Sequence, residues 1–202
     1  MLRTQILPRK RKTVNKKPSP GRRVREIPIA SPRLDPRGEE LFEVLKGVFP
    51  SDLKCEIGIC VDIVTITVPK ESLVQVCQLL KDAQNLSFDY LCSISVVDYE
   101  ESEQRFEIVY HMVSLSTYYK VAVKTSVISA DPILPTVTSV WRSAEWFERE
   151  GHDLFGVIFL GHSNLSPLLL YEGFDGFPGR KSFPFHDYQA VSYTHLTLPT
   201  KA

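Results

Sequence analysis

The first stretch with a regular spacing of apolar residues begins near Gly38. Its apolar residues fall at every third and fourth position, as they do on one face of a helix: Leu41, Val44, Leu45 and Val48. Pro50 ends the pattern, because proline cannot continue a helix. A second stretch opens at Pro69 and repeats the same spacing: Leu73, Val76, Cys77 and Leu80. Two helices are therefore predicted.

Five further stretches have the two-residue period or the β-branched composition of strands. They lie at 55–60, 61–68, 88–98, 105–114 and 118–128. In the fourth, one face should carry Phe106, Ile108, Tyr110 and Met112, and the other Arg105, Glu107 and His111. The polar residues 100–103 are typical of a turn, so the third and fourth strands should pair as an antiparallel hairpin.

A third helix is expected to begin at Pro135, because proline is tolerated in a first helical turn, and to end near His152. Its apolar stripe would be Val137, Val140, Trp141 and Ala144. The resulting order is α-β-β-α-β-β-β followed by one helix. It predicts an α+β fold, a two-layer sandwich with a mixed sheet and helices packed on one face.

After Gly156 glycine and proline alternate, which predicts an extended coil. This coil carries many large apolar side chains: Phe159, Leu168, Leu169, Leu170, Tyr171, Phe174, Phe177 and Phe183. Long irregular segments are usually functional or docked, and exposed apolar surface marks interaction sites. The coil is therefore predicted to bind a partner protein. We expect four parts: a basic disordered extension (1–38), an α+β core (39–157), an interaction segment (158–190) and a non-native tail (191–202).

The expectation of a non-native tail rests on the residues at the C-terminus. Residues 191–200, Val-Ser-Tyr-Thr-His-Leu-Thr-Leu-Pro-Thr, resemble the translation of a sequencing-library adapter, and the competing interpretation is a genuine threonine-rich tail. His195 is therefore kept out of any site.

The net charge of zero conceals an uneven distribution. Residues 1–37 hold 12 of the 24 lysines and arginines but only two of the 24 acidic residues, Glu26 and Asp35. This segment could contact nucleic acid or another anionic surface, act as an organellar presequence, or be a solvated extension. The remaining residues are acidic on balance. No apolar run approaches the roughly 20 residues of a membrane span, so membrane contact is expected only through partners.

Motifs for common cofactors are absent from the sequence. It has no glycine-rich phosphate loop, no dinucleotide-binding turn and no Gly-x-Ser-x-Gly elbow. Four cysteines (Cys55, Cys60, Cys77 and Cys92) form no Cys-x-x-Cys pair, so iron–sulfur patterns do not fit. Their apolar neighbours favour buried free thiols over disulfides or metal ligands.

Polar side chains concentrate at 145–153. One interpretation makes Glu150 and Asp153 a carboxylate pair for acid–base work, or a metal site with His152. The favoured interpretation is structural: Arg149 bridges acidic neighbours, and the carboxylates bind backbone amides of the following coil. His162 is expected to be a hydrogen-bonded loop histidine rather than a metal ligand.

The stretch from Glu148 to Val157, Glu-Arg-Glu-Gly-His-Asp-Leu-Phe-Gly-Val, resembles the thirty-kilodalton subunit family of respiratory complex I, the C subunits of NADH-quinone oxidoreductase. The preceding segment 135–141, the upstream segment 105–111, and the later segments 159–162 and 177–184 are similar to the family in the same order. The likeness covers about residues 39–184. Structural or interface roles are expected for Trp141, Trp146, Glu148, Arg149, Glu150, Asp153, Gly156, Gly161, His162, Pro178, Arg180, Lys181 and Pro184.

The resemblance implies a subunit without catalytic residues, metal or cofactor of its own; FMN and iron–sulfur clusters would lie in partner subunits of the complex. The chain would sit beside the forty-nine-kilodalton (D) subunit and other hydrophilic-arm subunits, peripheral on the cytoplasmic side of the bacterial inner membrane. There it would support proton-translocating electron transfer from NADH to quinone. The alternatives are the homologous subunit of a membrane-bound hydrogenase or another ferredoxin- or quinone-linked complex, and a nucleic-acid-binding module.

The chain departs from the family pattern at a few positions. Ser163 stands where the family usually has proline, and Ser166 and Pro167 stand where it usually has arginine. Gly179 replaces a usual leucine and Ser182 a usual acid.

Overall fold

The structure, a computed structural model, describes residues 33–49, 53–99 and 104–184. The basic residues 1–32, the polar turn at 100–103 and the adapter-like residues 191–202 lie outside the described residues, so the expectations about them stay predictions.

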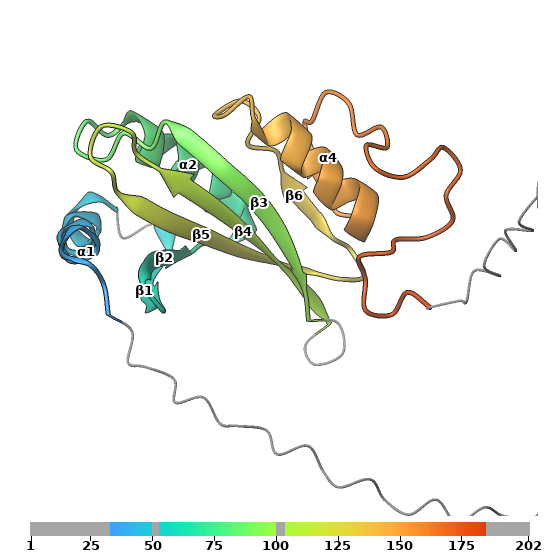
Figure 1. The fold of residues 1–202 in the computed structure, drawn as a ribbon, viewed down its shortest axis with the longest axis horizontal. Helices are drawn as coiled ribbons and strands as arrows, with labels where there is room; N and C mark the ends of the chain where they lie inside the picture. Colours follow the sequence, from blue (N-terminus) through green and yellow to red (C-terminus); the bar gives the residue numbers. More distant parts are fainter. Residues whose placement is uncertain (1–32, 50–52, 100–103, 185–202) are drawn as a thin grey trace, which may run out of the picture. The chain divides into compact units, whose positions relative to one another are not determined.

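The elements follow the predicted order, with additions near the C-terminus (Figure 1). They are α1 (Pro36–Val48), β1 (Glu56–Cys60), β2 (Ile63–Thr67), the 3-10 helix η2 (Lys70–Ser72), α2 (Leu73–Asp82), β3 (Tyr90–Asp98), β4 (Arg105–Val113), β5 (Lys120–Ile128), β6 (Ile133–Pro135), α4 (Ala144–Phe155) and β7 (Ile158–Leu160).

Five strands form one mixed sheet in the order β1-β2-β5-β4-β3. Within this sheet only the contact between β2 and β5 is parallel, and the other pairs are antiparallel. The predicted hairpin of β3 and β4 is confirmed, with Tyr90 opposite Val113 at one end and Asp98 opposite Phe106 at the other. The α+β class with a mixed sheet is therefore confirmed.

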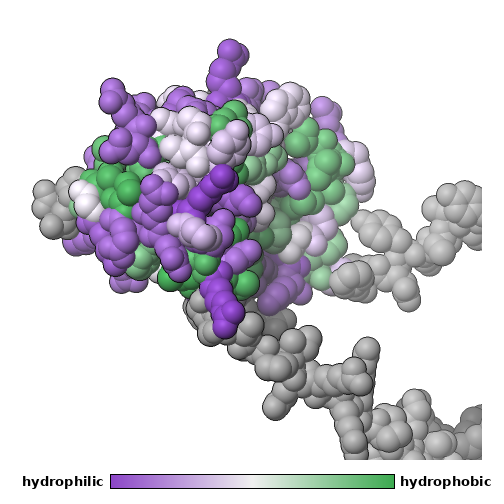
Figure 2. Space-filling model, turned by 60° about the vertical axis from the view of Figure 1, so that its left-hand side comes forward, coloured by the Kyte–Doolittle hydropathy of each residue, from purple (hydrophilic) through white to green (hydrophobic). Residues whose placement is uncertain are grey.

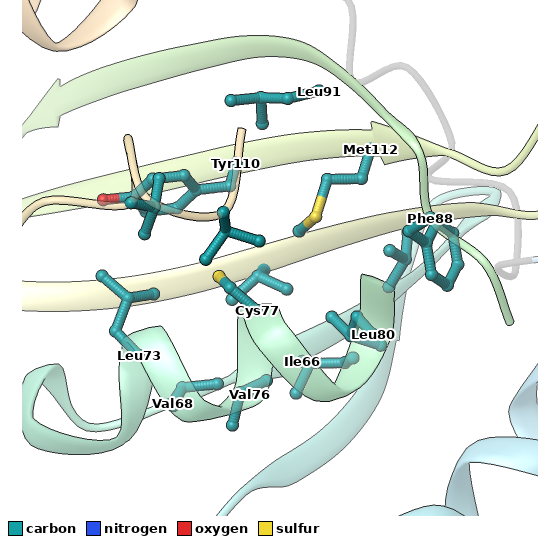
Figure 3. Packing of buried hydrophobic residues seen from close by; sticks show 14 of the residues in the cluster. Ile66, Val68, Leu73, Val76, Cys77, Leu80, Phe88, Leu91, Tyr110 and Met112 are labelled. Atoms are coloured by element: carbon teal, nitrogen blue, oxygen red, sulfur yellow. The ribbon is translucent and has the colours of Figure 1, made fainter. Parts of the chain in front are cut away.

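The core lies between the helices and one face of the sheet. The four β4 residues predicted to share that face, Phe106, Ile108, Tyr110 and Met112, are at most 1% exposed. Side chains of α2, among them Cys77 and Leu80, pack against β4 and β2 (Figure 3). Burial of each leucine- or phenylalanine-sized side chain contributes about 1.5–3 kcal/mol, so this layer is the main source of stability.

The first helix begins earlier than the apolar pattern indicates. Asp35 caps it, because its side chain accepts a hydrogen bond from the Gly38 N–H at 2.7 Å, and Pro36 occupies the first turn. The boundary expected at residue 38 therefore falls inside α1.

The prediction of a helix starting at Pro135 is wrong. Pro135 ends the short strand β6, which pairs in parallel with β7, and α4 begins only at Ala144. The residues of the predicted apolar stripe are nevertheless buried, at 0–4% exposure. Separate turns between β6 and α4 bury the same positions that a continuous helix would bury. Trp141 belongs to this stripe, and its indole Nε1 donates to the Phe88 carbonyl at 3.0 Å.

Two smaller expectations also change. Phe159, placed by the sequence in the interaction segment, is 1% exposed and belongs to β7, so the free coil starts after Leu160.

All four cysteines are free thiols, but only Cys77 is buried. Cys60 is exposed because it ends the edge strand β1. Among the described helices, none is long and apolar enough to cross a membrane.

Candidate functional site: the junction of helix α4 and the C-terminal coil

Residues 161–184, called the coil below, run beside α4 after the short strand β7 (Figure 1). Gly156 caps the C-terminal end of helix α4; its φ of 74° is left-handed, and its N–H donates to the His152 carbonyl at 2.8 Å. A Cβ at this position would lie 2.6 Å from the Phe177 ring and 2.9 Å from the Arg180 guanidinium. Glycine is therefore required here both by the backbone turn and by the close approach of the coil.

Glu148 ties the middle of α4 to the segment that precedes it. Its fully buried carboxylate accepts hydrogen bonds from the Val137 N–H at 2.8 Å and from the Thr136 hydroxyl. Burial raises the pKa of Glu148 from 4.5 to about 7, although the two hydrogen bonds act in the opposite direction. Burial also raises the pKa of Cys77 and of Tyr110, and the nearby Glu148 raises both further.

Asp153 binds the coil through its backbone. One oxygen of its carboxylate accepts from the N–H groups of Leu168, Leu169 and Leu170 at 3.1, 2.7 and 2.9 Å. Burial alone would raise the pKa of Asp153, but the three hydrogen bonds and the neighbouring His152 hold it below its ordinary value. The prediction that the carboxylates of this stretch bind amides of the following coil is confirmed for Asp153, whereas Glu148 binds the preceding segment.

Arg149, one helical turn before Asp153, binds the preceding residues of the coil. Its guanidinium lies 5.1 Å from the Trp146 ring and donates to the Ser166 hydroxyl at 3.1 Å and to the Pro167 carbonyl at 3.0 Å. The expectation that Arg149 bridges acidic neighbours is wrong, because its side chain reaches the coil instead. Ser166 and Pro167 are positions where the sequence departs from the family pattern, and here they supply the acceptors.

Arg180 holds the far part of the coil. It donates from Nε to the Phe155 carbonyl at 2.7 Å and lies between the Phe106 and Phe177 rings, at 5.1 and 4.7 Å from their centroids. A cation at a helix C-terminus is favoured by the helix dipole, and its stacking on aromatic rings adds to this.

A neighbouring contact was missed by the sequence reasoning. The Lys181 N–H donates to Asp98 at the end of β3, at 2.7 Å. Asp98 is 5% exposed, and the only sequence signal was an acidic residue closing an apolar strand.

His162 is a hydrogen-bonded loop histidine, as predicted. Its Nε2 donates to the Glu145 carbonyl at 3.1 Å, while its Nδ1 accepts from the Asn164 N–H at 3.0 Å. These partners require the neutral ring with its proton on Nε2.

The other predicted site residues differ in exposure. Glu150, Lys181 and Pro184 are exposed, Pro178 is half-buried, and Gly161 adopts a φ of 87°.

The polar side chains of the junction hold the backbone of the coil in place, and the junction exposes large apolar side chains. Glu150 is exposed while Asp153 is engaged with three amides, so the two do not form a carboxylate pair. No group of three or more histidine, cysteine or acidic side chains able to hold a metal occurs among the described residues. The coil and α4 together expose Trp146, Leu169 and Tyr171 at 57, 61 and 68%. We call these three residues the junction surface.

The raised pKa of Glu148 makes stability depend on pH. The folded state binds the Glu148 proton more tightly than the unfolded state, so the stabilisation is complete below pH 4.5 and is lost as the pH rises through about 7. The contribution of Glu148 to the free energy of unfolding is therefore roughly 3 kcal/mol smaller above pH 7 than below pH 4.5. Glu148→Gln stays neutral and keeps an acceptor for the Val137 N–H. We expect its melting temperature to vary less between pH 5 and 8 than that of the unsubstituted chain, and parallel curves would contradict this.

Removal of the Asp153 carboxylate should release the coil. Asp153→Ala leaves three backbone N–H groups without their acceptor, which should lower the free energy of unfolding by about 1–3 kcal/mol and speed proteolysis within 161–184. The matched control is Glu150→Ala on the same helix, which should change stability by less than about 0.5 kcal/mol. Limited proteolysis followed by mass spectrometry checks this. Equal cleavage of the coil in both variants would show that Asp153 does not hold it.

Comparison with known proteins assigns the chain to one family. Residues 66–189 match the family described as respiratory-chain NADH dehydrogenase, 30 Kd subunit. The second NADH-quinone oxidoreductase C subunit of Rhizobium meliloti (strain 1021) is 42% identical over 133 residues, which cover 66% of this chain and 72% of the relative. The corresponding C subunit of Paramagnetospirillum magneticum is 37% identical over 160 residues and 79% of either chain.

Two solved structures share the fold. The trypsin-resistant fragment of Nqo5 is 30% identical, with a TM-score of 0.51, covering 64% of this chain and 99% of the fragment. A chain of the archaeal membrane-bound sulfane sulfur reductase has a TM-score of 0.63 over 72% of this chain and 86% of its own length, at 24% identity. The chain belongs to the family of the 30 Kd subunit of the respiratory-chain NADH dehydrogenase.

Proposed function

We propose that this chain is a structural subunit of the peripheral arm of a proton-translocating NADH:quinone oxidoreductase, and that its junction surface binds the neighbouring D subunit. Family membership and relatives named as C subunits of NADH-quinone oxidoreductase support a place in this enzyme complex. The observation that carries the proposal is the coil itself, which is fastened to α4 by Asp153, Arg149 and Arg180 while exposing large apolar side chains.

The composition of the junction surface suits a protein partner. Tryptophan, tyrosine and arginine are enriched at the energetically important positions of interfaces. Trp146 and Tyr171 are half or more exposed, and Arg149 lies over the Trp146 ring. Tyr171 in turn packs edge-on against Phe174, with centroids 5.4 Å apart. Because the coil is already ordered by hydrogen bonds within the chain, binding would cost less conformational entropy than folding it on the partner.

The proposal assigns no redox step to this chain. The polar side chains of the junction bind backbone groups of the chain itself, which leaves them a positioning role. FMN and iron–sulfur clusters would then belong to other subunits, and electrons would pass from NADH to quinone outside this chain. Contact with the inner membrane, on its cytoplasmic side, would be made through those partners.

A related complex is the second candidate. It would make the chain the homologous subunit of a hydrogenase-type or ferredoxin-linked complex; the fold is shared with a chain of an archaeal respiratory membrane complex, the membrane-bound sulfane sulfur reductase. The relatives at 37 and 42% identity favour NADH:quinone oxidoreductase. Neighbouring genes separate the two, because a large subunit with nickel-binding cysteines would indicate the hydrogenase-type complex.

Polar replacement of the junction surface should block assembly without unfolding the chain. In the double variant Leu169→Ser with Tyr171→Ser, we expect a melting temperature within a few degrees of the original. Incorporation into the complex should fall about tenfold or more, because central interface residues each contribute about 2 kcal/mol or more. Co-purification with the D subunit and native gels of solubilised membranes measure this.

A matched control separates interface loss from general surface change. Ile128 is 66% exposed at the end of β5, on the sheet face away from α4, so Ile128→Ser should assemble normally. If the double variant assembles as well as the control, the proposed role of the junction surface is wrong. If the unsubstituted chain never joins the complex, the proposed function fails.

A further inference from the structure

Strand β1 lies at an edge of the main sheet, where among the described strands it pairs only with β2. An edge strand presents unpaired backbone N–H and C=O groups, to which another extended chain can bind. Proteins commonly protect such an edge with proline, lysine or a bulge. β1 contains neither proline nor lysine, and its register with β2 has no bulge. Its outer edge is therefore suited to pairing with a further strand.

The register decides which backbone groups of β1 lie on the outer edge. Directly after β2, the Val68 N–H donates to a carbonyl of β5 at 2.8 Å, so alternate residues of β2 face β5 and those between them face β1. Thr65 is one of those between, and it lies opposite Gly58. The backbone of Gly58 therefore faces β2, and the N–H and C=O groups of Ile57 and Ile59 face away from it. Within the described part of the chain, these outward groups have no hydrogen-bond partner.

Gly58, between the two outward-facing residues, is not required by the backbone or the packing of the chain itself. A Cβ at this position would meet nothing within 4 Å, and its φ is not in the left-handed region. Glycine weakens the interior of a strand, because it has no side chain to pack and loses more conformational freedom on folding than other residues. Such a glycine often marks a place where another backbone approaches closely. Gly58 thus gives an independent reason to expect a further strand here.

An apolar groove lies between β1 and α1. It consists of two hollows of about 660 and 300 Å³, both with Phe42 on their wall. The other apolar side chains that line them are Leu34, Leu45, Phe49, Ile57 and Ile59. Figure 2 presents the α1 side of the domain, where hydrophobic residues are exposed among hydrophilic ones. A strand paired with β1 would place every second side chain in this groove, because residues opposite each other in a sheet point to the same face.

Charge does not select the occupant of the groove. Its basic side chains stand beside acidic ones, and Lys46 is paired with Glu43 at 2.8 Å. The charged residues on the walls are Arg33, Glu39, Glu43, Lys46 and Lys54. The outward backbone groups and the apolar lining remain as the selecting features, and both fit an extended protein segment with apolar residues at alternate positions.

We propose that an extended segment of another subunit of the same complex pairs with β1 as a sixth strand, with apolar side chains opposite Ile57 and Ile59 seated in the groove. The inference rests on the proposed function and adds a second interface to it. A second copy of this chain fits less well, because two β1 strands would join five residues with five, whereas a stable interface uses roughly 20–30 residues a side. A subunit held in the complex by other contacts needs no such area, because its effective concentration is already high.

Residue-resolved amide hydrogen exchange tests the strand pairing. In the isolated chain, the outward N–H groups of Ile57 and Ile59 should exchange rapidly, whereas those of Gly58 and Cys60, which face β2, should be protected. In the purified complex, exchange at positions 57 and 59 should slow about tenfold or more, and exchange at positions 58 and 60 should change little. This alternation separates strand pairing from simple covering of the groove, which would not distinguish the two sets of amides.

Photo-crosslinking identifies the occupant. The full chain carries the photoreactive residue p-benzoylphenylalanine in place of Glu56, the exposed first residue of β1. A control chain carries it in place of Glu150, which is exposed on α4, beside the opposite edge strand β3. After irradiation of the purified complex, mass spectrometry identifies the attached peptide. We expect position 56 to crosslink to a segment of another subunit with apolar residues at alternate positions, and position 150 not to reach that segment.

A proline at the outer edge provides a third measurement. Ile59→Pro removes the outward N–H, so incorporation into the complex should fall about tenfold relative to Ile59→Ala, which shortens the same side chain but keeps the donor. Neither variant removes a hydrogen bond to β2, so their melting temperatures should agree within a few degrees.

Each other outcome overturns the inference. Unchanged exchange at positions 57 and 59 in the complex contradicts it, as does equal incorporation of the proline and alanine variants. A crosslink from position 56 to a second copy, to the chain's own residues, to lipid or to nothing contradicts the proposed occupant. A chain that joins the complex with these amides unprotected leaves the proposed function intact, whereas a chain that never joins removes both.

Discussion

Three hydrogen bonds from consecutive backbone N–H groups to one carboxylate, that of Asp153, are the interaction on which the junction depends. The coil has no strand partner and no helix of its own among the described residues, yet the polar groups of its backbone need partners wherever it packs on the domain. Helix α4 supplies them through Asp153, Arg149 and the carbonyl of Leu154, which accepts from the Gly179 N–H at 2.9 Å. An irregular segment thereby becomes an ordered surface, and this order is what lets apolar side chains be presented to a partner.

Two acidic residues of α4 show how burial and hydrogen bonding compete. Glu148 is fully buried and accepts two hydrogen bonds. Desolvation raises its pKa more than the hydrogen bonds lower it, so the pKa rises to about 7. For Asp153, burial raises the pKa less than the three backbone donors and the neighbouring histidine together lower it, so its pKa falls. Each carboxylate accepts hydrogen bonds from the chain's own groups. The most recognisable stretch of the sequence thus uses two of its carboxylates to bind groups of the chain itself.

Much of the fold followed from periodicity, because each strand of the main sheet and each of the first two helices is long enough to show its period. Strands β6 and β7 could not be predicted, since three residues carry no period and the two strands are paired across α4. The spacing from Val137 to Ala144 was misleading because separate turns can bury the same positions as a continuous helix. In the site, the hydrogen bonds from backbone N–H groups to Asp153 could be predicted, because a carboxylate stands directly before a coil. The contact of Asp98 with Lys181 was not, since it joins residues 83 positions apart.

The central claim is that the chain itself orders the coil before any partner binds, and amide hydrogen exchange of the isolated chain tests it most directly. If the Asp153 carboxylate holds the coil, the amides of Leu168, Leu169 and Leu170 should exchange at least about tenfold more slowly than in an unstructured peptide. Exchange of these three amides at the unstructured rate, while the amides of β4 and β5 stay protected, would show that the coil is ordered only by its partner and would contradict the account.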